Sequence, residues 1–62
     1  MISAIFEDET QGYKFEERYQ TKDSFLRAIR KLKGIIFLHA VDYEAGIAIR
    51  ASNLWDYKRM RE

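Results

Sequence analysis

Apolar residues in the stretch 21–34 recur at three- and four-residue steps, the spacing of one face of an α-helix. This stripe consists of Phe25, Ala28, Ile29 and Leu32, with Leu26 at its edge. Thr21 is placed to cap the helix with its hydroxyl group, and Gly34 is placed to end it in a left-handed conformation. The pattern therefore predicts a helix over residues 21–34, which needs an apolar partner because short helices are marginal in water.

Two segments before this helix alternate apolar and polar residues, as strands with one buried face do. Their inward residues are Ile2, Ala4 and Phe6 in the first segment and Tyr13, Phe15 and Tyr19 in the second. A four-residue hairpin loop, residues 9–12, puts nearly all the large apolar side chains on one face, whereas a five-residue loop would split them. The register then pairs Asp8 with Tyr13, Phe6 with Phe15, Ala4 with Glu17 and Ile2 with Tyr19. Glu17 is the misfit, and we expect it near the sheet edge or beside a cation.

The segment of residues 35–43 is apolar on both sides, which indicates an interior strand covered on both faces. Residues 44–46 fit a three-residue hairpin loop with glycine in the left-handed region. This loop pairs Tyr43 with Ile47, Val41 with Ile49 and His39 with Ala51. The predicted inner face then carries Ile35, Phe37, His39, Val41, Tyr43, Ile47 and Ile49, and the outer face carries Ile36, Leu38, Ala40, Asp42, Ala48 and Arg50.

The order of elements predicts one α+β mini-domain, residues 1–62, with ββαββ topology. If the helix crosses the sheet and returns beside the first strand, the four strands form a mostly antiparallel sheet in the order 2-1-3-4. The helix covers one face, and the other keeps too much apolar surface to leave in water. We expect a short C-terminal helix or tail, residues 52–62, to cover that second face, with a fifth strand as the alternative. Otherwise a second copy could close the face as a symmetric dimer.

Composition narrows the class of protein. The 62 residues include no cysteine, which removes disulfides and thiolate metal sites, and 47% of them are hydrophobic, which argues against disorder. The longest uncharged run, residues 34–41, is too short to span a bilayer, and the N-terminus lacks a signal-peptide pattern. We therefore expect a cytoplasmic protein that does not bind membranes.

The net charge of +1 is unevenly distributed along the chain. Residues 1–17 carry −4, residues 18–34 carry +5, residues 35–49 carry −2 and residues 50–62 carry +2. The cations of the predicted helix are Lys22, Arg27, Arg30, Lys31 and Lys33. Such an uneven distribution of charge affects how partners approach and bind more than it affects the fold.

Residues for catalysis or metal binding are sparse. His39 is the only histidine, and we expect a packed, neutral core side chain because no spacing places a nucleophile and a carboxylate beside it. The acidic residues 7–9 and 16–17 belong to a hairpin that offers no cleft for acid–base work. The sequence has no calcium-loop spacing and no glycine-rich phosphate loop. We therefore expect no enzyme, no cofactor and no metal site.

The residue types that dominate protein interfaces are gathered near the C-terminus. The leading hypothesis is a small protein-binding module or inhibitor that docks on a larger macromolecule. Its expected partner contacts are Trp55, Tyr57, Arg59 and Arg61, followed by Arg27, Arg30 and Lys31. For the two aromatic residues, packing over the second sheet face is an equally good interpretation. Small inhibitor proteins of phages and mobile elements share this size and a ββαβ layout, which is an analogy of architecture alone.

The same basic residues permit a second hypothesis, a nucleic-acid-binding regulator. Lysine and arginine side chains of the helix and tail could neutralise phosphates, and Trp55 and Tyr57 could stack on bases. The near-neutral total charge and the acidic first hairpin argue against it, because nucleic-acid-binding domains usually present a strongly basic surface.

Overall fold

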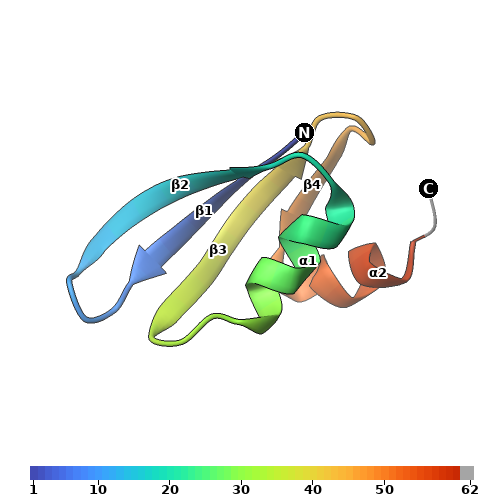
Figure 1. Ribbon diagram of the computed structural model, residues 1–62. Coiled ribbons are helices and arrows are strands. Elements are labelled where there is room, and N and C mark those ends of the chain that lie inside the picture. Colours follow the sequence, from blue (N-terminus) through green and yellow to red (C-terminus); the bar gives the residue numbers. More distant parts are fainter. Residues whose placement is uncertain (61–62) are drawn as a thin grey trace.

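The computed structural model describes residues 1–60 and confirms the α+β architecture. Four antiparallel strands form one sheet in the order β2-β1-β3-β4, and both helices lie against it (Figure 1). The elements are β1 (Ile2–Asp8), β2 (Tyr13–Tyr19), α1 (Lys22–Arg30), β3 (Ile35–Asp42), β4 (Ile47–Arg50), a 3₁₀ turn η1 (Ala51–Asn53) and α2 (Leu54–Arg59).

The first hairpin has the predicted register, with Asp8 opposite Tyr13 and Ile2 opposite Tyr19. The Asp8 carboxylate accepts backbone N–H groups of the loop at 2.9 and 3.1 Å, and Gly12 closes the loop at φ 76°. Glu17 lies exposed on the edge strand β2. A charged residue on the inward side of an edge strand hinders pairing with another chain, which gives the misfit a physical role.

Helix α1 begins as predicted but ends earlier. Thr21 caps it and forms a capping box with Ser24. The helix ends at Arg30, not near Gly34, because the next two backbone N–H groups bond three residues back and tighten the last turn. The link then runs to the first hairpin, where the Gly34 carbonyl accepts the Glu9 N–H at 3.3 Å. Strand β3 can thus start opposite the end of β1.

A β-bulge in β3 overturns part of the predicted face assignment. Ile5 pairs with His39 and Phe6 pairs with Phe37, so Leu38 is an extra residue on β3. One extra residue reverses the alternation of all following side chains. His39 is therefore exposed, not packed in the core, while Ala40 and Asp42 are buried.

The second hairpin has a four-residue loop, not the three-residue loop predicted. Asp42 pairs with Ile47 and Ala40 pairs with Ile49, a slip of one residue. The Asp42 carboxylate accepts the N–H groups of Glu44 and Ala45, both at 3.1 Å, in the same way that Asp8 closes the first loop. The bulge and the slip cancel, so Ile47 and Ile49 still face the core side as predicted.

The C-terminal segment is a short helix, but it covers the opposite face from the one expected. Helix α2 lies beside α1 on the same side of the sheet (Figure 1), and Tyr57 belongs to the core formed there. The second sheet face is left without a helix from residues 1–60. None of the helices in that part of the chain has the length and apolar character needed to cross a bilayer.

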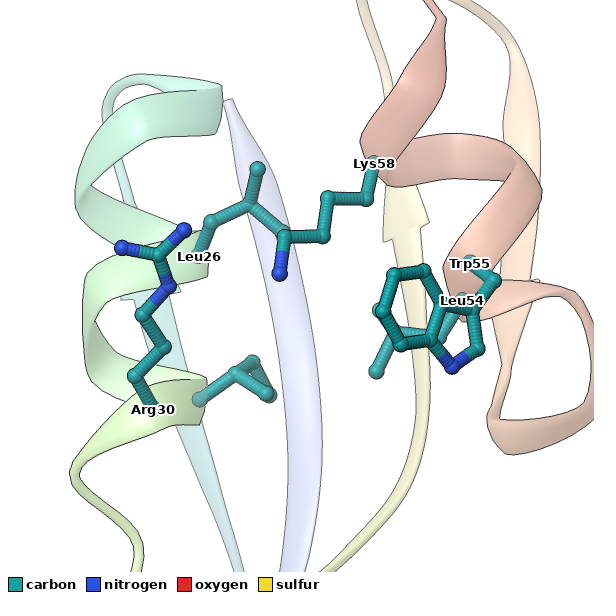
Figure 2. Close-up of a pocket in the computed structure, with 6 residues that line it drawn as sticks. Leu26, Arg30, Leu54, Trp55 and Lys58 are labelled. Atoms are coloured by element: carbon teal, nitrogen blue, oxygen red, sulfur yellow. The ribbon is translucent and has the colours of Figure 1, made fainter.

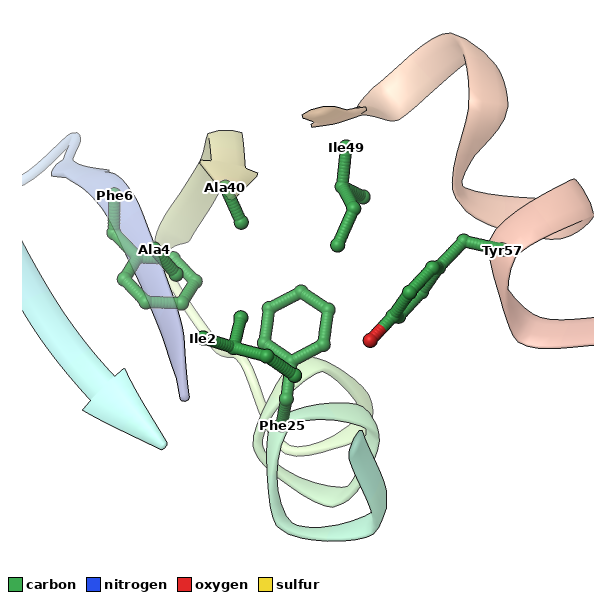
Figure 3. Close-up of a cluster of buried hydrophobic side chains, with 7 residues drawn as sticks. All are labelled: Ile2, Ala4, Phe6, Phe25, Ala40, Ile49 and Tyr57. Atoms are coloured by element: carbon green, nitrogen blue, oxygen red, sulfur yellow. The ribbon is translucent and has the colours of Figure 1, made fainter. Parts of the chain in front are cut away.

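One cluster of buried side chains joins the sheet to both helices (Figure 3). Its members are Ile2, Ala4, Phe6, Phe25, Ala40, Ile49 and Tyr57. Phe25 is fully buried, and its ring lies 5.6 Å from Tyr19, 5.8 Å from Phe37 and 6.1 Å from Tyr57, measured between ring centroids. These distances are typical of favourable aromatic pairs.

Truncation of Phe25 tests this central position. We expect Phe25→Ala to lower the free energy of unfolding by about 3–5 kcal/mol, a large share of the ~5–15 kcal/mol of a typical domain. Phe25→Leu, which keeps most of the apolar volume, should cost ~1.5 kcal/mol or less. Urea unfolding followed by far-UV circular dichroism measures both. Equal stability of the two variants would contradict the central role of the ring.

Candidate functional site

The candidate site is an apolar groove between the two helices, with a volume of ≈ 170 Å³ (Figure 2). We call it the interhelical groove. Helix α1 contributes Leu26, Ile29 and Arg30, and α2 contributes Leu54, Trp55 and Lys58. In Figure 2 the side chains of Leu26 and Lys58 extend toward one another from the two helices, while Arg30 runs alongside α1.

The wall from α1 follows from the width of its apolar stripe. Phe25 at the centre of the stripe is fully buried, whereas Leu26 and Ile29 pack against the core and are only half-buried. The apolar stripe of α1 is too wide to be buried completely against the sheet. Its edge therefore remains available to a neighbouring element. Here that neighbour is α2.

The wall from α2 is fixed by Tyr57, which is 3% exposed. Its hydroxyl donates to the Asp42 carboxylate at 2.8 Å, and the ammonium group of Lys22 lies 4.5 Å from the centroid of its ring. Lys22 also donates a hydrogen bond to the carbonyl of Met60, just after α2. These contacts hold one side of α2 against the sheet and α1.

Fixing Tyr57 inward turns Trp55 outward, because residues two apart point to different sides of a helix. Trp55 is 67% exposed. Lys58 and Arg59 follow it by three and four residues, so their cationic groups reach its ring, at 5.0 and 5.9 Å from the centroid. The groove is thus edged by an aromatic surface that carries two positive charges.

The Asp42 carboxylate holds α2 in place by accepting the hydrogen bond of the Tyr57 hydroxyl. Burial alone would raise its pKa, but hydrogen bonds from the Ala45 amide, the Tyr57 hydroxyl and the Glu44 amide, with the charge of the N-terminus, outweigh burial. The pKa therefore lies below its ordinary value of 3.8. The group stays ionised at neutral pH and remains an acceptor for Tyr57.

The two layers of the fold carry opposite charge. The helical layer, residues 22–34 and 51–60, contains seven cations and two acids. The strand layer, residues 1–21 and 35–50, contains three cations and seven acids. Within residues 1–60 the only ion pair of the helical layer joins Arg27 to Asp23 at 4.0 Å, so Arg30, Lys58 and Arg59 form none there.

The structure separates the residues predicted to contact a partner. Trp55 and Arg30 line the groove, and Arg59 lies over the Trp55 ring. Arg27 and Lys31 are exposed on and just after α1, outside the groove lining. Tyr57 is a buried core residue and is not available to a partner. It packs on the helix side of the sheet, not over the second face. Arg61 lies outside the described residues.

Sequence reasoning missed four lining residues: Leu26, Ile29, Leu54 and Lys58. The position of Leu26 at the edge of the apolar stripe was a usable signal, but the groove exists only because α2 packs beside α1. Across residues 1–60, no group of three or more histidine and acidic side chains is placed to hold a metal ion.

Comparison of the chain with protein-family models, with curated proteins and with solved structures finds no match.

The variant Asp42→Asn tests the contribution of this carboxylate to stability, because that contribution should depend on pH. Because the folded pKa is lowered, the ionised carboxylate stabilises the fold above pH 3.8, and this contribution is lost as the pH falls through the folded pKa. We expect Asp42→Asn to lower the free energy of unfolding at neutral pH by about 1–3 kcal/mol, with a smaller difference in acid. Urea unfolding at both pH values measures this difference.

Asp56→Asn is the matched control, since it removes an exposed carboxylate from α2. Its effect should be small at either pH. A difference between Asp42→Asn and the natural chain that stays constant with pH would contradict the assigned role of Asp42.

Proposed function

We propose that this chain is a small non-enzymatic protein-binding module that holds an acidic, partly apolar segment of a partner protein in the interhelical groove. The observation that carries the proposal is Trp55, a large ring that stays 67% exposed at the mouth of an apolar groove in a 62-residue domain. Exposed apolar surface rimmed by polar groups is typical of interaction sites.

The dimensions of the groove favour a protein partner over an enclosed small molecule. Pockets for drug-sized ligands usually measure about 300–1,000 Å³, whereas this groove measures ≈ 170 Å³. It suits a few apolar side chains of a larger partner, packed between Leu26 and Leu54. Tryptophan and arginine are enriched among the residues that dominate binding energy at such surfaces.

The charges around the groove support an acidic partner. Arg30, Lys58 and Arg59 form no ion pair within residues 1–60, so acidic side chains of a partner can pair with them. The positive helical layer would also steer an acidic partner toward this side of the molecule. We propose that a partner segment bound in this way is withheld from its other interactions, so that the chain acts as an inhibitor. The cysteine-free composition supports a cytoplasmic setting.

Nucleic-acid binding remains the second candidate, favoured by the cation-flanked Trp55. Phosphates would meet the same lysine and arginine side chains, and a base could stack on the ring. Nucleic-acid binding gives no comparable role to the apolar walls of the groove, which are formed by Leu26, Ile29 and Leu54. We therefore place a protein partner first.

Selection of peptides tests the proposal without knowledge of the partner. A random peptide library displayed on phage is selected against the immobilised chain. We expect the enriched sequences to be acidic and to contain large apolar residues. Labelled copies should bind in fluorescence anisotropy with an affinity that falls as salt rises. Trp55→Ala should weaken binding about 30-fold, the effect of losing ~2 kcal/mol at a hot spot, without unfolding the domain.

Arg30→Glu should also weaken these peptides, whereas Arg18→Glu, on exposed β2, is the matched control. Basic enriched peptides, or peptides that bind Arg30→Glu and Trp55→Ala as tightly as the natural chain, would refute the proposal. A mixed-sequence single-stranded oligonucleotide forms a separate arm. Saturable oligonucleotide binding that displaces the peptides would favour the nucleic-acid alternative.

A further inference from the structure

The side chain of Lys58 lies across the interhelical groove. It extends from α2 toward Leu26 of α1 (Figure 2), it lines the groove, and its ammonium group lies 5.0 Å from the centroid of the Trp55 ring. A lysine stem can cover apolar surface while its charged end stays in water. The apolar walls of the groove are therefore partly covered, in the free chain, by a side chain of the chain itself.

The position of Lys58 follows from the spacing and the charges of α2. Trp55 precedes it by three residues, so the two side chains lie on the same side of the helix. Asp56, the acid of α2, precedes Lys58 by two residues and does not face it. Lys58 forms no ion pair within residues 1–60. Its ammonium group lies instead against the Trp55 ring, a contact that is weak where water has access to it.

The other two cations around the groove are placed differently. Arg30 lines the groove from α1, but its side chain runs alongside that helix (Figure 2). Arg59 lies 5.9 Å from the centroid of the Trp55 ring and is outside the groove lining. Of these three cations, Lys58 alone both lines the groove and lies over the ring. A movement of Lys58 therefore changes access to the apolar walls, whereas a change at Arg59 alters only the charge beside them.

The space beside the Lys58 stem limits what can enter the groove. With this side chain in place the volume is ≈ 170 Å³, so a bulky apolar group has to displace the stem. A neutral group would then separate the ammonium group from the ring and offer it no new partner. A group that carries an anion would pair with the displaced ammonium group through a charge-assisted hydrogen bond. Displacement of Lys58 therefore favours a ligand that is both apolar and anionic.

We propose that Lys58 determines the specificity of the interhelical groove, because it covers the groove against neutral apolar groups and uncovers it for apolar groups that carry an anion. The inference rests on the proposed function of the groove and adds the residue that selects the ligand. The bound segment places an apolar side chain between Leu26 and Leu54 and a carboxylate near enough to draw Lys58 aside. A segment with apolar residues alone is rejected by the same lysine.

Two dyes that share the same apolar rings test this role. Anilinonaphthalene sulfonate carries an anion and N-phenylnaphthylamine is neutral, and both fluoresce more strongly in apolar surroundings. In fluorescence titrations the natural chain should bind the sulfonate roughly tenfold tighter than the neutral dye. Lys58→Ala should bind the neutral dye roughly fivefold tighter than the natural chain does, and the sulfonate more weakly. Lys58→Arg keeps a long stem and the charge, so it should retain the selectivity of the natural chain.

Arg59→Ala separates the loss of charge from the loss of cover. It removes a cation from the same ring but leaves the groove lining intact, so it should weaken binding of the sulfonate without admitting the neutral dye. Arg18→Ala, on exposed β2, is the control for net charge and should bind both dyes as the natural chain does. NMR of the backbone amides locates the bound dyes, and the shift changes should concentrate in residues 26–30 and 54–58.

Three results would overturn the proposal. The first is a neutral dye that binds the natural chain and Lys58→Ala equally, or binds neither. The second is an Arg59→Ala variant that admits the neutral dye as Lys58→Ala does, and the third is a set of shift changes that lies outside the groove. Circular dichroism of every variant separates loss of binding from loss of the fold.

Failure of the proposed function would give a different result. In that case no selected peptide would bind through Trp55, although the dyes would still be sorted by Lys58. Peptide binding through Trp55, combined with dye selectivity that does not change in Lys58→Ala, would refute only the role of Lys58.

Discussion

The ring of Phe25 is the point on which the rest of the structure depends. It is the fully buried residue of α1, and it contacts an aromatic side chain of β2, of β3 and of α2. A chain of 62 residues can build only one substantial core, so both helices must share it. Because α1 and Tyr57 pack on the same face of the sheet, a groove remains between the two helices, and the other face has no helix of residues 1–60 over it.

Much of the fold could be predicted because the signals are local. Alternation and turn length set the register of the first hairpin, and the apolar stripe set the inward face of α1. The bulge at Leu38 has no local signature, since neighbouring residues on both sides of it are apolar. The second loop did carry a signal, because Asp42 and Gly46 repeat the spacing of Asp8 and Gly12, whose loop length was correctly predicted.

The candidate site was harder to predict than the fold. Composition identified Trp55 and the basic residues, but the placement of α2 depends on a contact between residues fifteen positions apart, the Tyr57 hydroxyl and the Asp42 carboxylate. That contact decides which aromatic residue is core and which is surface. Because both helices lie on one side of the sheet, the cations of the helical layer gather around the groove and most of the acids lie in the strand layer. A charge dipole along the sequence therefore becomes a dipole across the thickness of the molecule.

The bulge in β3 has a consequence for how the length of this chain can vary. Before the bulge the odd-numbered residue Phe37 faces the core, and after it the even-numbered residues Ala40 and Asp42 do. Deleting Leu38 would restore strict alternation and leave Phe37, Ala40 and Asp42 on the core side, because Leu38 is the residue without a partner on β1. Losing the extra residue would therefore keep the composition of the core, whereas deleting any other single residue of β3 would require a new bulge or turn the following side chains to the other face.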